Sequence, residues 1–159
     1  MPAEAHASSE TEPMISKRVL FICTGNYYRS RFAEAVFNHH AERIGSCWRA
    51  FSRGLAIHMA PDFPLLSEHT SAALAMRGID LHHTGRVRVQ LSEADLLASD
   101  FIVALKEAEH RPMFIQQFPS WTERVRFWKV SDLDEAQASE ALPAIERLVE
   151  ALLDELRVS

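Results

Sequence analysis

The residues best suited to chemistry lie in one short segment, Cys23-Thr24-Gly25-Asn26-Tyr27-Tyr28-Arg29-Ser30. The segment follows a short apolar run and precedes a stretch in which apolar residues recur at helical spacing. A loop at the N-terminus of a helix directs several backbone N–H groups, and the positive end of the helix dipole, toward its centre. The segment therefore predicts a cradle for a dianion such as phosphate.

Each residue type in this segment suits that chemistry. A positive local field stabilises a thiolate, so Cys23 would be a nucleophile at neutral pH. Arg29 can grip two phosphoryl oxygens with its planar guanidinium, a geometry that lysine cannot reproduce. Ser30 could donate its hydroxyl hydrogen to the thiolate, and Gly25 and Asn26 tolerate the left-handed backbone that a tight loop needs.

The flanking pattern indicates strands that alternate with helices. Strands are predicted at 18–22, 47–53, 101–105 and 125–130, and the first of them is expected to be buried. Helices are predicted from Ser30 to near Gly45, at 67–77, after a capping box at Ser92, and with Pro112 in the first turn. A long amphipathic last helix is marked by Leu142, Ile145, Leu148, Val149, Leu152, Leu153 and Leu156.

This alternation predicts an α/β fold. We expect a single domain at residues 16–159, in which a four-stranded parallel sheet is flanked by helices on both faces. The anion-binding loop would lie between strand 1 and helix 1, and residues 1–15 would form a flexible N-terminal tail.

The charge distribution is compatible with an anionic substrate, although the 159-residue chain has a formal net charge of -5. Residues 1–12 hold three acids and no base, and residues 134–159 hold seven acids and two arginines. The region between them holds 15 basic and 12 acidic residues, a net +3 that includes the whole predicted loop. The absence of a basic run argues against nucleic acid as a partner.

Several other classes of protein are disfavoured by the sequence. Cys23 and Cys47 are too few for a disulfide framework, and there is no CxxC motif. The first 16 residues lack the basic and apolar regions of a signal peptide, and no apolar run approaches 18 residues, so we expect a cytoplasmic protein without a membrane partner. Adjacent histidines, as in His39-His40 and His82-His83, diverge on a helix or strand, so we expect no metal site and no cofactor.

The stretch VLFICTGNYYRSRFAEAVF resembles the N-terminal signature of the low-molecular-weight protein tyrosine phosphatases, which hydrolyse phosphomonoesters through a cysteinyl-phosphate. The resemblance extends over most of the chain from about Lys17. It includes FSRG at 51–54, RGIDLHH at 77–83, LSEADLLASDFIVAL at 91–105 and FWKVSD at 127–132.

By position, the resemblance implies that Cys23 is the nucleophile, that Arg29 binds the phosphoryl group and that Ser30 supports the thiolate. Substrate would be bound by the other loop residues together with that serine: Thr24, Gly25, Asn26, Tyr27, Tyr28 and Ser30. The family's histidine that steadies the loop asparagine falls on His83, with His82 adjacent. The general acid falls on Asp132. Typical members have Asp-Pro there, whereas this chain has Asp132-Leu133-Asp134, so Asp134 is an alternative.

Three residues depart from the family pattern. Tyr28 occupies the position where many members carry a second cysteine, so a protective disulfide with Cys23 should be missing. Tyr27 replaces a small or aliphatic residue of the pocket wall that helps to separate phosphotyrosine from phosphoarginine specificity; its ring could stack on an aromatic leaving group or narrow the entrance. Arg31 replaces the usual proline, and we expect a solvated helix residue that adds positive charge.

These features predict a cysteine-dependent phosphomonoester hydrolase, most simply a protein phosphotyrosine phosphatase. Its partner would be a phosphorylated protein or a small phosphomonoester. Phosphoarginine hydrolysis is an alternative, as is a phosphate-binding or phospho-residue recognition module that has lost catalysis. An arsenate reductase on the same fold would need further cysteines near residues 79–91, where the sequence has none.

Overall fold

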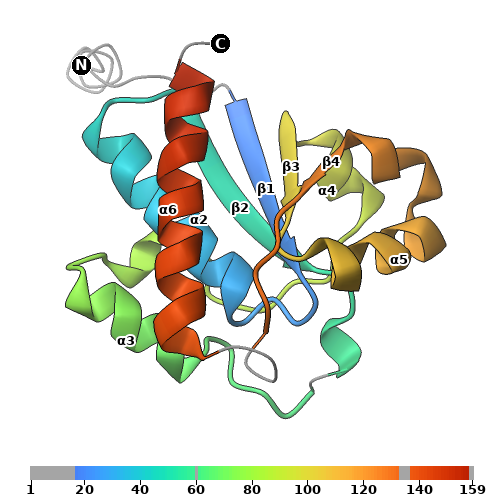
Figure 1. Cartoon of the computed structure of the whole chain (residues 1–159), viewed down its shortest axis with the longest axis horizontal. Coiled ribbons are helices and arrows are strands. Elements are labelled where there is room, and N and C mark those ends of the chain that lie inside the picture. Colours follow the sequence, from blue (N-terminus) through green and yellow to red (C-terminus); the bar gives the residue numbers. More distant parts are fainter. Residues whose placement is uncertain (1–16, 60, 133–136, 158–159) are drawn as a thin grey trace, which may run out of the picture.

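The computed structural model describes residues 17–59, 61–132 and 137–157. Strands and helices alternate along the chain (Figure 1). The strands are β1 (Lys17–Cys23), β2 (Trp48–Gly54), β3 (Phe101–Ala104) and β4 (Val125–Phe127). The helices are α2 (Arg29–Arg43), α3 (Glu68–Met76), α4 (Glu93–Leu97), α5 (Glu107–Gln117) and α6 (Ala138–Arg157), with 3-10 turns η1 (Ile57–Met59), η2 (Leu81–His83) and η3 (Pro119–Arg124).

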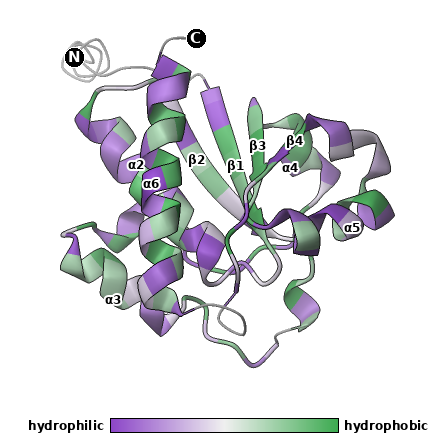
Figure 2. Ribbon diagram, in the orientation of Figure 1, coloured by the Kyte–Doolittle hydropathy of each residue, from purple (hydrophilic) through white to green (hydrophobic). Residues whose placement is uncertain are grey.

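The strands form one parallel sheet in the order β2-β1-β3-β4. Successive residues of β1 point to opposite faces, and each face is covered by its own hydrophobic core. Val19, Phe21 and Cys23 belong to the core shared with α2 and α6, whereas Leu20 and Ile22 belong to the core shared with α4 and α5. In Figure 2 the ribbons of β1 and β3 are mostly hydrophobic in colour, apart from the hydrophilic start of β1. The predicted four-stranded α/β fold with helices on both faces is confirmed.

The topology determines where a ligand can bind. The chain passes from β1 to the edge strand β2 on one side, and then crosses to β3 and β4 on the other side. In open parallel sheets, ligands bind beyond the carboxyl ends of the strands where the strand order reverses. Cys23 is the last residue of β1, so the loop that follows it lies at this position.

Most of the predicted elements are present with shifts of a residue or two. Ser67 caps α3 by accepting a hydrogen bond from the backbone N–H of His69, and the backbone N–H of Ser92 donates to Asp95 as predicted for a capping box. The last helix buries its predicted apolar stripe. Strand β4 ends at Phe127 and is therefore shorter than the predicted strand at 125–130. Beyond its end, Lys129 forms an isolated bridge with Lys106.

One expected position is wrong. Pro112 lies inside α5 rather than in its first turn, because the helix already begins at Glu107 and carries Glu107 and Glu109 in that turn. Acidic side chains near the positive end of a helix dipole favour this earlier start. The predicted tail at residues 1–15 lies outside the described residues. Within the described ranges, no helix combines the length and the apolar character that crossing a membrane would require.

Candidate active site

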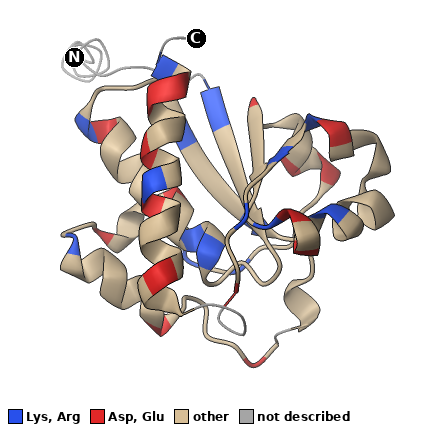
Figure 3. Ribbon diagram, viewed as in Figure 1, with Lys and Arg blue, Asp and Glu red and all other residues tan. Residues whose placement is uncertain are grey.

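The loop between β1 and α2 has the tight backbone that its sequence predicts. Asn26 has a φ of 54°, in the left-handed region. The same prediction is wrong for Gly25, whose φ is not positive; a side chain there would instead meet the Tyr27 ring, at 3.0 Å from an added Cβ. The helix that follows has no side-chain cap, so its first backbone N–H groups remain available to an anion. Basic residues mark this end of α2 in Figure 3.

Cys23 is buried and lies within hydrogen-bonding distance of Ser30, with 3.0 Å between Sγ and Oγ. Ser30 Oγ accepts a hydrogen bond of 3.0 Å from the side-chain amide of Asn26. Because the amide hydrogen occupies one lone pair of this oxygen, the hydroxyl hydrogen of Ser30 is free to point at sulfur. The loop thus offers a donor to the negatively charged form of Cys23.

The side chain of Asn26 is held on three sides. Besides Ser30, its amide donates to Ser52 Oγ at 3.0 Å, and its Oδ1 accepts from the backbone N–H of Val89 at 2.8 Å. Ser52 in turn donates to the buried carboxylate of Glu34 at 2.7 Å. Because the hydroxyl hydrogen of Ser52 points at Glu34, its oxygen is left to accept from Asn26, which fixes the orientation of that amide.

The expectation that His83 steadies the loop asparagine is wrong in this geometry, because Ser52 and Val89 fill that role. The ring of His83 packs instead against His39 and His82. Ser52 could have been suspected from its place near the end of β2. Glu34 could not, since a helix residue eleven positions after Cys23 gives no sign of burial.

Arg29 is almost fully buried and is clamped from one side. Its Nη1 donates to Glu109 Oε1 at 3.1 Å and to the carbonyl oxygen of Val130 at 2.9 Å, and its Nη2 donates to Glu109 Oε2 at 2.9 Å. Its Nε is also buried and has no hydrogen-bond partner among the residues that the structure describes. Burial lowers the pKa of Arg29, but the hydrogen bond to Glu109 and the charges of Cys23, Glu109 and Asp132 raise it overall.

Glu109 accepts hydrogen bonds from three side chains, one each on the loop after β1, on α2 and on α5. Its Oε2 accepts from Arg29, from the hydroxyl of Thr24 and from His110 Nε2, the last at 3.2 Å. The backbone N–H of Lys106 donates to His110 Nδ1, so in the neutral ring the hydrogen lies on Nε2 and points at Glu109. Burial raises the pKa of Glu109, but the hydrogen bonds from His110 and Arg29 lower it far below its usual range. Thr24 therefore faces α5 with its side chain.

Asp132 lies beside the same guanidinium, with Oδ2 at 3.5 Å from Arg29 Nη2. Its side chain is 33% exposed, so it lies at the mouth of the site and remains accessible to solvent. The alternative acid, Asp134, lies outside the described residues. The structure thus gathers Cys23, Arg29, Ser30, Asn26 and Asp132 in one region.

The two loop tyrosines occupy different environments. Tyr28 is buried in the core between β1 and α2, so its ring is not presented to solvent at the site. Tyr27 is partly exposed and meets the exposed ring of Phe63 edge to face at 4.7 Å. Burial and the negative charge of Asp132 raise the pKa of Tyr27 to about 12. Arg88 lies 5.8 Å from the centroid of the Tyr27 ring and donates to the carbonyl oxygen of Gly25.

Arg31 is buried, so the expectation of a solvated residue is wrong. Its guanidinium donates to Thr84 Oγ1 at 2.7 Å and to the carbonyl oxygens of Leu65, at 2.6 Å, and of Gly85. It also reaches the carbonyl oxygen of Asn26 at 3.4 Å. A single side chain thus ties the anion loop to two segments that lie 34 and 54 residues further along the chain.

The comparisons with known proteins agree with this geometry. Residues 18–158 match the family model described as low molecular weight phosphotyrosine protein phosphatase. The chain is similar to the human protein of that name, with 31% identity over 103 residues, which cover 62% of this chain and 60% of that protein. It is also similar to the protein-arginine-phosphatase of Bacillus subtilis strain 168, with 31% identity over 107 residues and 67% of each chain covered.

A solved structure supports the same assignment. The low molecular weight protein tyrosine phosphatase from T. tengcongensis superposes with a TM-score of 0.74 and 26% identity, over 88% of this chain and 99% of that one. The family model covers far more than half of the chain. The chain therefore belongs to the low molecular weight phosphotyrosine protein phosphatase family.

Proposed function

We propose that the protein is a cysteine-dependent phosphomonoester hydrolase that removes phosphate from phosphotyrosine in proteins. The observation that carries this proposal is the hydrogen bonding of the buried Arg29 side chain. Its terminal nitrogens are held from behind by Glu109 and Val130, while its buried Nε keeps a donor without a partner among the described residues. Such a donor, next to Cys23 and the uncapped N-terminus of α2, suits a bound phosphoryl group.

In the first step, the thiolate of Cys23 attacks phosphorus in line and the bond from phosphorus to the ester oxygen breaks. Arg29 Nε and the loop N–H groups hold the equatorial oxygens, where charge accumulates in the transition state. Asp132 donates its proton to the departing oxygen, for which its partly exposed position is suited. The product of this step is a cysteinyl-phosphate.

In the second step, a water molecule attacks the phosphorus of this intermediate. Asp132, now a carboxylate, accepts a proton from the water, and the bond between sulfur and phosphorus breaks. The thiolate leaves with its electron pair and is stabilised by the hydroxyl of Ser30, which lies 3.0 Å away. Inorganic phosphate is released, and the site returns to its starting state.

Phosphotyrosine is favoured as substrate by the aromatic edge of the site. A hollow of about 290 Å³ lies beside the loop and is lined by Tyr27, Phe63, Pro64, Ser67, Glu68 and His69. Aromatic rings pack well on such a wall. Phosphoarginine remains the second candidate, because one relative is a protein-arginine-phosphatase with 31% identity to this chain.

Turnover of p-nitrophenyl phosphate by the wild type, Cys23→Ser, Asp132→Asn and Asp134→Asn tests the chemistry. We expect the wild type to turn over this substrate between about pH 5 and 7, and Cys23→Ser to show no turnover. Asp132→Asn should lower kcat by about 10²- to 10⁴-fold. A wild type that binds vanadate without turnover would establish the binding module instead. If Asp134→Asn loses its turnover while Asp132→Asn keeps wild-type turnover, the general acid is Asp134.

The substrate class is tested separately with matched phosphotyrosine and phosphoarginine peptides. We expect a higher kcat/KM on phosphotyrosine, and a reduced preference for it in Tyr27→Thr, because the ring wall is removed. A wild-type preference for phosphoarginine would replace the first substrate with the second, without affecting the assignment of the nucleophile.

A further inference from the structure

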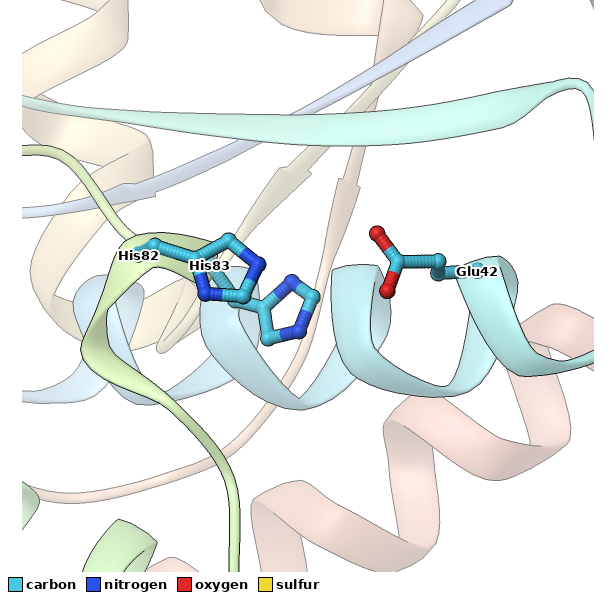
Figure 4. Close-up of side chains that lie close together, drawn as sticks. All are labelled: Glu42, His82 and His83. Atoms are coloured by element: carbon cyan, nitrogen blue, oxygen red, sulfur yellow. The ribbon is translucent and has the colours of Figure 1, made fainter. Parts of the chain in front are cut away.

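A cluster of imidazole and carboxylate groups lies where η2 meets the second half of α2, outside the set of residues assigned to catalysis. One oxygen of Glu42 and one ring nitrogen from each of His82 and His83 lie within 4.8 Å of one another. Figure 4 shows the two rings side by side on η2, with the carboxylate of Glu42 beside them on α2. Such a mixture of nitrogen and oxygen ligands is what zinc prefers in proteins.

The adjacent histidines converge here, contrary to what a helix or strand would impose. They belong to a single 3-10 turn, and their ring centroids lie 3.9 Å apart. His83 is buried, and its ring lies 5.6 Å from that of His39 on α2. Among the described residues, the ring nitrogens of His83 form no hydrogen bond.

The second histidine is oriented by a carboxylate. Asp80 caps η2 by accepting from the backbone N–H of His82 at 2.8 Å, and the same oxygen lies 2.8 Å from His82 Nδ1. With Nδ1 donating to Asp80, the lone pair of the ring is on Nε2. Metal-binding histidines are commonly held in this way, by a carboxylate on the nitrogen opposite the metal.

We propose that Glu42, His82 and His83 form a zinc-binding site in which Asp80 orients His82. The ligand atoms lie within 4.8 Å of one another, and the exposed side chain of Glu42 can rotate inward to reach the spacing of a tetrahedral zinc ion. The charges of Glu42 and Asp80 balance those of the metal ion. A water molecule takes the fourth position, as it does in other sites with three protein ligands.

Zinc in this site would tether η2 to α2 and so stabilise a segment that supports the anion loop. The residue after the turn, Thr84, accepts from Arg31 and donates to Glu34, and both of these reach the surroundings of Asn26. Zinc binding should therefore be measured directly and as thermal stability, rather than as a change in the chemical step.

Calorimetric titration of the full chain with zinc chloride tests the proposal. We expect one ion per chain with a dissociation constant in the micromolar range or tighter, and a raised Tm in excess zinc. Glu42→Gln and His82→Ala should each weaken binding at least about tenfold, and Asp80→Asn about 10- to 100-fold, since it acts through the ligand. His58→Ala, an exposed histidine on η1, is the matched control and should bind as the wild type does.

Two other zinc ligand sets must be separated from this one. Cys23→Ser removes the reactive thiol and should leave the stoichiometry unchanged. His40→Ala disrupts a neighbouring cluster with Glu146 and Glu150. If zinc binding is absent, is lost in either of these variants, or survives intact in both Glu42→Gln and His82→Ala, the proposed site is overturned. Because Glu42 and His82 are exposed, their variants should fold normally, which a urea titration verifies.

Discussion

Replacement of Glu109 by glutamine should release the arginine that we propose binds phosphate, and it should also destabilise the fold. The carboxylate accepts from Arg29 through both oxygens, and Oε2 also accepts from Thr24 and His110. In Glu109→Gln an amide NH₂ would face these three donors, if Oε1 keeps its bond to Arg29 Nη1. The buried guanidinium would then lose its nearest carboxylate and, among the residues that the structure describes, keep only Asp132, at 3.5 Å from Nη2.

The size of the effect follows from burial. Removal of one partner of a buried ion pair costs about 3–5 kcal/mol. The side chain of Glu109 is 28% exposed, so water offsets part of that loss, and we expect about 3 kcal/mol from urea unfolding at pH 7. Displacement of Arg29 by about 1 Å should lower kcat/KM on p-nitrophenyl phosphate by about 10²-fold. Glu107→Gln, on the same helix with a surface partner, is the control and should change stability by under about 1 kcal/mol.

The dependence on pH provides a second test. The pKa of Glu109 is lowered in the folded state, so its contribution to stability is complete above the unfolded value of about 4.3 and declines as pH falls below it. The difference between wild type and Glu109→Gln should therefore be constant from pH 6 to 8 and should shrink toward pH 3. If the unfolding free energy of Glu109→Gln lies within about 0.5 kcal/mol of the wild-type value at pH 7, and turnover is unchanged, then Glu109 does not hold Arg29 in place.

Three further substitutions test other parts of the structure. Arg31→Met should make the segments around Leu65 and Gly85 more sensitive to limited proteolysis and cost about 1–3 kcal/mol in urea, since it removes the donor to the buried hydroxyl of Thr84 and to two carbonyl oxygens; unchanged protection would contradict this. Asn26→Ala should cost more stability than Asn26→Gly, by a backbone part of about 1 kcal/mol, because glycine adopts a positive φ without strain; equal losses in the two variants would exclude backbone strain. Ile145→Ala, in the fully buried face of α6, should lower the unfolding free energy by about 2–5 kcal/mol without changing KM.

The local pattern of the chain was enough to predict the fold, and it located the loop around which the candidate site is built. An apolar strand, a loop of the form C-x5-R-S and an amphipathic helix are adjacent in sequence, so their order constrains their geometry. The same is true of the α6 stripe, whose spacing matches its buried face. Pro112 shows the limit of local rules, because proline suits a first turn but does not by itself fix where the helix begins.

The sequence by itself determined the chemistry that one loop can perform, since Cys23, Arg29 and Ser30 lie within eight consecutive residues. Which distant groups complete that loop was decided by the tertiary structure alone. Glu109 reaches Arg29 across 80 residues, and Ser52 rather than His83 supports Asn26, because parallel strands bring their carboxyl ends together regardless of separation in sequence. The burial of Arg31 and the convergence of His82 and His83 have the same origin: packing between elements sets the surroundings of a side chain.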